Sequence, residues 1–275
     1  MGALAFPICE LEQEELRRKS VLVLRGTGFN FWHYLPLLRN FRLDDLAQFQ
    51  AIYTISGSTL LLWLYCLMEQ GVISMSAASA YDRAMRHCLN RHGCMERVAR
   101  MLTGRYPYRA EDFLRVLDLL TVPEAWRQTL DQLPLQNWRV VAHEESRQEL
   151  LVLDPQANPT FAVGEVISRA VTWSRLFHLP FCWRTPYHGM LIGDFDFAGA
   201  RVHRQFYEHL RAVHASAQVY QINRFRNEDR GAHHFIRVGP GRLVRFWQII
   251  DFAAFYLGIA NPRYLRAATR ELPGR

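Results

Sequence analysis

The sequence predicts an α/β protein built on a mostly parallel sheet. A short β-branched apolar run at residues 20–24 ends in a glycine-containing loop, as a buried strand does when it enters a tight turn. A second strand candidate at 49–55 leads directly into an apolar helix-like stretch at 59–69. Helical periodicity at 32–39 separates the two strands, so the order strand, helix, strand, helix indicates parallel strands with helices on both faces.

The later elements extend this pattern. Apolar residues recur at helical spacing from 76 to about 132, which predicts a helical cap, about 76–136, beside the sheet. The segments 138–143 and 149–154 have the pattern of a hairpin. Further expected elements are a helix at 163–173, a strand at 187–197 that ends in acidic residues, a helix at 205–215, a strand at 217–223 and an apolar helix at 246–257.

The size and composition fit one globular domain. The chain has 275 residues, of which 49% are hydrophobic and 21% charged, so it can bury a substantial core. We expect an N-terminal extension at 1–19 and a single domain at 20–275.

The N-terminal region and the apolar runs favour a cytoplasmic location. The longest apolar run, 60–68, is much shorter than the roughly 20 residues of a membrane-spanning helix. Acidic residues follow a very short apolar patch near the N-terminus, without a basic leader, which argues against a secretory signal. Peripheral contact with a membrane is the open alternative.

Cysteine and histidine spacing predicts neither a metal site nor a cofactor. The five cysteines include no C-x-x-C pair, so they suggest neither a disulfide framework nor a zinc ribbon. Among eleven histidines, only His233 and His234 are adjacent, and no H-E-x-x-H spacing is present.

The basic charge suits an anionic partner. The formal charge is +7 and the isoelectric point is about 9.4, which fits an anionic membrane surface or a phosphopantetheine carrier protein. No recognised nucleic-acid motif accompanies the arginines, so we expect no nucleic acid partner. A solvated basic face is the simpler interpretation.

Ser56 is the candidate nucleophile. The run 53–59 places it between the second strand and the following helix, where a sharp turn would lift its hydroxyl out of the sheet. The helix N-terminus would favour the negative charge that develops during acyl transfer. The alternative is structural: Ser56 or Ser58 would be an ordinary helix N-cap.

Three features follow one another in the order that a serine acyl hydrolase uses. A glycine-containing loop follows the first strand, a serine lies on the turn after the second, and an aspartate ends a much later strand. Loop NH groups can form an oxyanion hole, the serine can attack an acyl carbon, and the carboxylate can take its proton.

This order resembles the patatin-like phospholipase family. The family loop G-G-G-x-R-G corresponds to residues 26–31, which keep Gly26 and Gly28. The family G-x-S-x-G falls on residues 54–58, and its D-G-G or D-G-A falls on 194–196; the serine and the aspartate are kept, and the glycines are lost. The stretches 140–152 and 165–180 are also similar, so the resemblance spans about residues 20 to 200.

The resemblance implies a three-layer fold with a central, mostly parallel sheet flanked by helices, a helical insertion, and a Ser-Asp dyad without histidine. The spacing from Gly189 favours Asp194 as the base, and Asp196, on the same side of an extended strand, is the alternate. The resemblance implies these site residues: nucleophile Ser56; base Asp194 or Asp196; oxyanion hole Gly26, Thr27, Gly28 and Phe29.

The departures from the family pattern bear on the mechanism. Thr54 and Ser58 occupy the places of two glycines that usually permit a crowded turn. Asn30 replaces the family arginine, and Arg25 could supply positive charge from a different direction. Four histidines could restore a triad-like base, although each fits a surface or core role better: His33, His143, His178 and His188.

Three functions compete at this point. The leading one is an acyl hydrolase or acyltransferase that acts on a lipid or an acyl-thioester through an acyl-Ser56 intermediate. The second is a catalytically decayed relative that binds an acyl chain or a protein partner. The third is an adaptor that uses the basic tail to bind a nucleic acid or a membrane surface.

Overall fold

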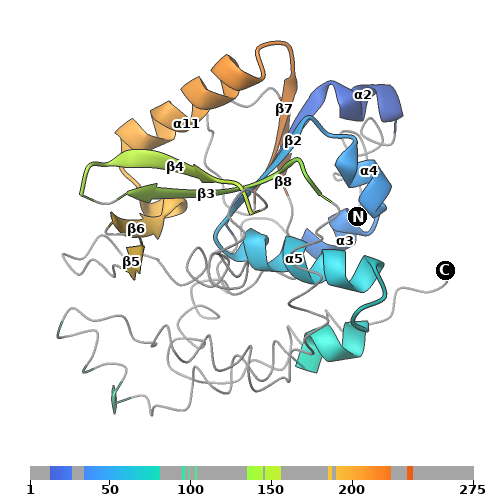
Figure 1. Cartoon of the computed structure of the whole chain (residues 1–275), viewed down its shortest axis with the longest axis horizontal. Coiled ribbons are helices and arrows are strands. Elements are labelled where there is room, and N and C mark those ends of the chain that lie inside the picture. The colour runs from blue at the N-terminus through green and yellow to red at the C-terminus, as the bar shows by residue number, and fades with distance from the viewer. Residues whose placement is uncertain are drawn as a thin grey trace.

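The computed structural model describes residues 13–26, 34–80, 95–96, 99, 103, 135–144, 146–155, 185–187, 190–223 and 234–237. They contain both helices and strands (Figure 1). Their bounds are α2 Glu14–Arg18, β1 Ser20–Leu24, α3 Leu35–Leu38, α4 Leu43–Ala47, β2 Ala51–Ile55, α5 Gly57–Glu69, β3 Trp138–Glu144, β4 Glu149–Leu153, β5 Thr185–Tyr187, β6 Met190–Asp194, the 3-10 turn η2 Phe195–Phe197, α11 Ala200–Val213, β7 Gln218–Asn223 and β8 His234–Arg237.

The strands form one mixed sheet that is mostly parallel. Strands β3, β2, β1, β7 and β8 lie side by side in that order and run parallel. Strands β4 and β6 each pair antiparallel with β3, and β5 pairs antiparallel with β6. The predicted α/β class with a mostly parallel sheet is therefore confirmed.

The central strands are buried on both faces. Every residue of β1 and of β2 is buried, and both strands read as continuous runs without polar alternation, apart from Ser20 and Thr54. Such runs are typical of parallel strands that helices cover on both sides.

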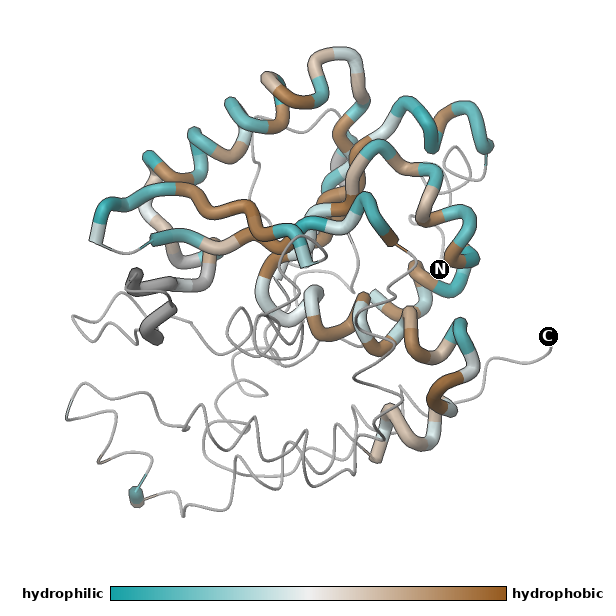
Figure 2. The backbone as a smooth tube through the Cα atoms, viewed as in Figure 1, coloured by the Kyte–Doolittle hydropathy of each residue, from teal (hydrophilic) through white to brown (hydrophobic). Residues whose placement is uncertain are grey.

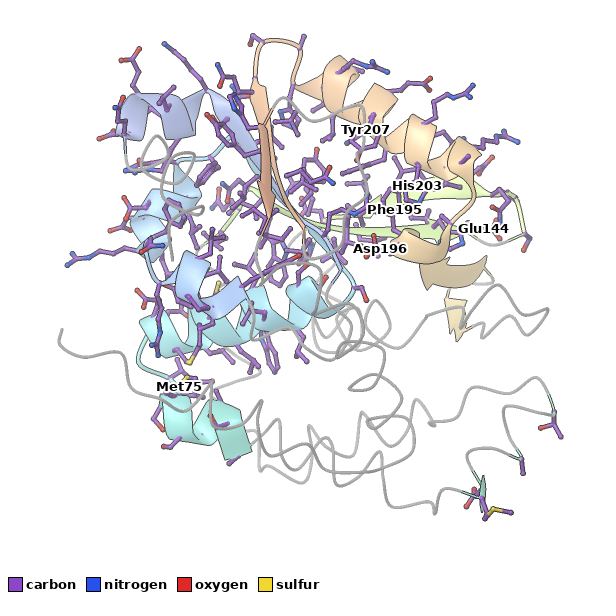
Figure 3. The ribbon with its side chains drawn as sticks, turned by 180° about the vertical axis from the view of Figure 1, so that it is seen from behind. Met75, Glu144, Phe195, Asp196, His203 and Tyr207 are labelled. Atoms are coloured by element: carbon purple, nitrogen blue, oxygen red, sulfur yellow. The ribbon has the colours of Figure 1, made fainter. Side chains whose placement is uncertain are left out.

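Helices α5 and α11 lie on opposite faces of the sheet (Figures 1 and 3). Helix α5 is apolar on almost every side, and residues 57 to 67 are all buried, as expected for such a helix. Helix α11 is amphipathic instead, and its apolar residues turn towards the sheet while polar residues cover the outside (Figure 2). The buried residues of α11 are Val202, Phe206, Tyr207 and Leu210.

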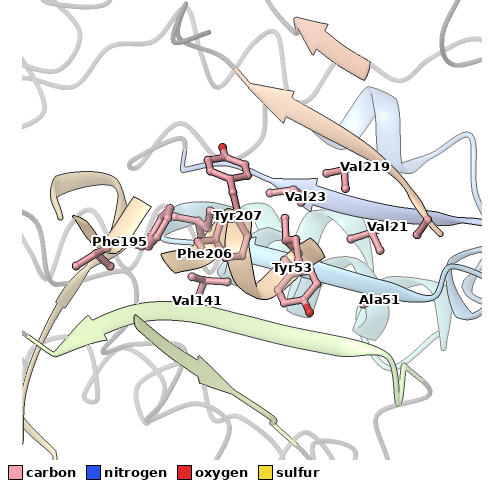
Figure 4. Packing of buried hydrophobic residues seen from close by; sticks show 13 residues of the cluster. Val21, Val23, Ala51, Tyr53, Val141, Phe195, Phe206, Tyr207 and Val219 are labelled. Carbon is pink, nitrogen blue, oxygen red and sulfur yellow. The ribbon is translucent and has the colours of Figure 1, made fainter. Parts of the chain in front are cut away.

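The core between α11 and the sheet contains valines of the strands and aromatic side chains of the helix (Figure 4). Tyr53 of β2 packs edge-on against Phe206, with ring centroids 5.6 Å apart. Phe206 in turn meets Phe195 at 5.0 Å, so this core extends to the 3-10 turn that follows β6. The packing therefore fixes the position of the segment that carries Asp196.

Most predicted elements within the described residues are confirmed with small shifts. Strand β1 has its predicted bounds, the hairpin is present as β3 and β4, and β7 starts one residue later than expected. Helix α5 begins two residues earlier than predicted. Two predictions were less accurate: α11 begins at Ala200, five residues before the predicted start, and the strand expected at 187–197 gives way to a 3-10 turn after Asp194. Most of the predicted cap, the helix at 163–173 and the helix at 246–257 lie outside the described residues.

Candidate active site at the end of the second strand

Ser56 has an unusual backbone conformation. It lies directly between β2 and α5, with φ 56° and ψ −130°. Residues other than glycine rarely adopt a positive φ, and such a conformation costs on the order of 1–3 kcal/mol unless the surrounding structure enforces it. This is the sharp strand-to-helix turn that the sequence predicted for a nucleophilic serine.

The Ser56 hydroxyl does not cap the helix. Ser56 occupies the N-cap position of α5, yet its side chain makes no capping hydrogen bond. The capping role that the alternative interpretation gave it is therefore absent, and its position needs another explanation. The residue is 5% exposed, so the hydroxyl lies in a nearly enclosed environment.

Strands β2 and β6 meet end to end along one edge of β3. Residues 140–144 of β3 pair with β4 on one edge. The other edge pairs first with β2, as far as Ile55 opposite Val141, and then with β6, whose Asp194 is opposite Ala142. Because β6 runs against β2, their carboxyl ends face each other at neighbouring positions of β3.

This head-on meeting brings the serine and the aspartate segment together. The chain leaves the sheet at Ser56 after β2, and at Phe195 after β6. The two departures occur side by side, because their last strand residues pair with consecutive residues of β3. The sheet register therefore positions Asp196 close to Ser56, although the two are far apart in the sequence.

Gly26 separates Ser56 from Asp196. A methyl group on Gly26 would lie 1.9 Å from Asp196 Oδ2 and 3.1 Å from Ser56 Cβ. The sum of these distances is the greatest separation that the two atoms can have. The carboxylate is thus within reach of the serine side chain, and only a residue without a Cβ fits between them.

Arg25 pairs with Asp196 on the other side of the carboxylate. Its Nη2 lies 2.7 Å from Asp196 Oδ1, and its guanidinium carbon is 5.3 Å from the centre of the Phe195 ring. The Arg25 backbone N–H donates to Ile222 O, which continues the pairing of β1 with β7. Phe195 also lies against His203 of α11, with ring centroids 4.5 Å apart (Figure 3).

Ser58 and Thr54, which lie two residues on either side of Ser56, hold the turn together. The buried Ser58 hydroxyl donates to Leu24 O and accepts the backbone N–H of Ile55, at 2.7 and 3.0 Å. Thr54 Oγ1 accepts the Trp138 indole N–H at 2.8 Å and the Thr59 hydroxyl at 3.2 Å. These side chains join β1, β2, β3 and α5 at the base of the turn.

The structure describes only some of the predicted site residues. It brings together Ser56, Gly26 and Asp196. The backbone of Asp194 pairs with β3, and its side chain is outside the description, as are Thr27, Gly28 and Phe29. His143 is buried in β3, with register partners in β4 and β6, whereas His33, His178 and His188 lie outside the described residues.

One feature of the sequence bears on the role of Arg25. An arginine that directly follows a buried apolar strand is forced into the interior, where a charge needs a partner of opposite sign. The partner itself could not be identified in advance, because it depends on the register of β6 on β3.

The described residues contain neither a metal-binding group nor a membrane-spanning helix. In the part of the chain that the structure describes, no group of three or more histidine, cysteine or acidic side chains is placed to hold a metal ion. None of the described helices combines the length and the apolar character that crossing a bilayer requires.

No protein-family model matches this chain, and no curated protein matches it.

Proposed function

We propose that this protein is a serine acyl hydrolase or acyltransferase of patatin-like fold, with Ser56 as the nucleophile and Asp196 as the general base. The observation that carries the proposal is the strained backbone of Ser56 at a strand-to-helix turn, beside a carboxylate across Gly26. Such strain persists where the surrounding structure enforces it, and it is concentrated at functional sites.

The proposed reaction begins with acylation of Ser56. Asp196 Oδ2 takes the proton of the Ser56 hydroxyl while Oγ bonds to the acyl carbon, and the carbonyl electrons move to its oxygen. The Gly57 N–H, at the start of the 13-residue helix α5, is one donor for this oxyanion, and the predicted loop at residues 26–29 supplies others. The leaving group then departs with the proton from Asp196.

Deacylation reverses these roles. A water molecule, or an acceptor alcohol or amine, gives its proton to Asp196 and bonds to the acyl carbon. The bond to Ser56 Oγ breaks, and Oγ takes the proton back from Asp196. The substrate class that suits this chemistry is a lipid ester or an acyl-thioester, and the basic charge of the chain favours one presented by an anionic membrane or carrier protein.

The choice of Asp196 over Asp194 rests on its contacts. The Asp196 carboxylate lies against Gly26, beside Ser56, and Phe195 is held by the core under α11. Asp194 was the first choice from its spacing to Gly189, so the experiment includes both residues.

Labelling with a fluorophosphonate probe tests the proposal. We expect one adduct on Ser56 by intact mass and peptide mapping, no adduct in Ser56→Ala, and a rate lowered on the order of 10²–10⁴-fold in Asp196→Asn. Asp194→Asn and the exposed control Ser76→Ala should keep the rate of the unmodified protein. Failure of the folded protein to label on Ser56 would contradict the proposal.

A catalytically decayed protein that binds an acyl chain or a protein partner is the second candidate. The low exposure of Ser56 favours it, because a working nucleophile must be reached by its substrate. The same labelling decides between the two, since a decayed site would leave Ser56 unmodified in well-folded protein.

A further inference from the structure

Arg25 is a buried cation at the centre of the site. Its side chain is 4% exposed, and that of its partner Asp196 is 20% exposed. A buried charge is tolerated only when it is paired, and removing one member of such a pair leaves the other uncompensated. Arg25 and Asp196 therefore form a partly buried ion pair, and each compensates the charge of the other.

The two oxygens of the Asp196 carboxylate have different neighbours. Oδ1 lies 2.7 Å from Arg25 Nη2, whereas Oδ2 lies against Gly26 on the side of Ser56. One oxygen thus lies against the guanidinium, and the other lies beside Gly26, which is also next to Ser56 Cβ. A base that a third group orients in this way is the general arrangement around an activated nucleophile.

We infer that Arg25 is a positioning residue that completes a Ser56, Asp196, Arg25 unit: its guanidinium holds one oxygen of the Asp196 carboxylate and so aims the other at Ser56. This inference rests on the proposed function and adds a residue to it.

The rival explanation is an ion pair that only stabilises the fold. Arg17 offers a matched control, because it is also nearly buried and its Nη2 lies 2.8 Å from Asp45 Oδ1 on α4, away from the site. Arg17→Met and Arg25→Met each remove one buried guanidinium and keep an unbranched side chain of similar reach.

The experiment measures the fluorophosphonate labelling rate of Ser56 in a double-mutant cycle. We expect Arg25→Met to lower the rate on the order of 10–100-fold, as misplacement of a catalytic group does, and Arg25→Lys to recover part of it. In Asp196→Asn, adding Arg25→Met should change the rate by less than about 3-fold, because the carboxylate that Arg25 aims is gone. Arg17→Met should leave the rate unchanged.

Thermal unfolding of each variant checks the fold. The double variant Arg25→Met, Asp196→Asn should melt higher than either single variant, because neither charge is left unpaired.

Failure of the inference and failure of the proposed function give different results. If Ser56 labels and depends on Asp196, but Arg25→Met labels at the unmodified rate, the inference is overturned and the proposed function stands. Equal rate losses on adding Arg25→Met to the unmodified protein and to Asp196→Asn would also overturn it. If Ser56 of the folded protein never labels, both the inference and the proposed function are overturned.

Discussion

At the scale of single residues, the backbone conformation of Ser56 lowers the stability of the folded protein. Its φ of 56° and ψ of −130° mirror an extended backbone, which glycine adopts freely and serine does not. The strain is therefore retained in Ser56→Ala, which removes only the hydroxyl, and relieved in Ser56→Gly.

We expect Ser56→Gly to be more stable than Ser56→Ala by on the order of 1 kcal/mol in free energy of unfolding. Urea denaturation followed by circular dichroism measures the difference. If Ser56→Ala proved the more stable variant, the turn would not be strained at this residue.

A glycine is required at position 26, because any side chain there would collide with the Asp196 carboxylate. We expect Gly26→Ala to lower the Ser56 labelling rate on the order of 100-fold, because its methyl group would displace the Asp196 carboxylate. The matched control is Gly71→Ala: Gly71 has φ 70° and nothing within 4 Å of its would-be methyl group. This control should lose stability through backbone strain and keep the labelling rate. An unchanged rate in Gly26→Ala would contradict the placement of Asp196.

At the scale of elements, Thr54 and Ser58 fasten the turn that carries Ser56. Their hydroxyls hold the end of β1, the end of β2 and the start of α5 in contact. The sequence could not specify these buried hydrogen bonds, because most of their partners come from other strands.

Ser58→Ala should lower the free energy of unfolding by about 1–3 kcal/mol, because it leaves the buried Ile55 N–H without its Ser58 partner. Chemical denaturation measures this loss. Labelling of Ser56 should persist in the folded variant, since Ser58 is not the nucleophile. Complete loss of labelling would instead make Ser58 part of the reacting group.

Helix α11 is attached to the sheet by a polar contact as well as by its apolar face. The Tyr53 hydroxyl lies 3.2 Å from His209 Nε2 and 3.0 Å from His214 Nε2. Burial raises the pKa of Tyr53 to about 12 and lowers the pKa of both histidines below their ordinary value of 6.5. The phenol can donate to only one histidine, so the other must donate to the phenol.

At the scale of the whole molecule, these histidines make stability depend on pH. Because their pKa values are lower in the folded state, the unfolded chain binds protons more readily below about pH 6.5. The contribution of the neutral histidines to the free energy of unfolding is therefore complete above that pH and is lost as the pH falls. We expect a lower melting temperature at pH 5.5 than at pH 7.5, and a smaller difference in the variant His209→Gln, His214→Gln. An equal difference in that variant would assign the dependence to other groups.

The sequence predicted the local elements well and the assembly of the site only in part. Apolar runs and turn residues predicted β1, β2 and the hairpin, because burial and turn formation depend on residues that are neighbours in the sequence. The insertion of β7 beside β1, and the meeting of β6 with β2 along β3, depend on pairing between distant segments. That pairing moved the preferred base from Asp194 to Asp196 and gave Arg25 its partner.

The meeting of β2 with β6 also has a consequence for synthesis on the ribosome. The turn at Ser56 can form from β1, β2 and α5 early in translation, whereas β6 and Asp196 emerge much later. Segments that emerge first can fold first. On the proposed function, the nascent chain would then carry its nucleophile long before its base, and would stay inert towards the lipids and thioesters around it until β6 had been made.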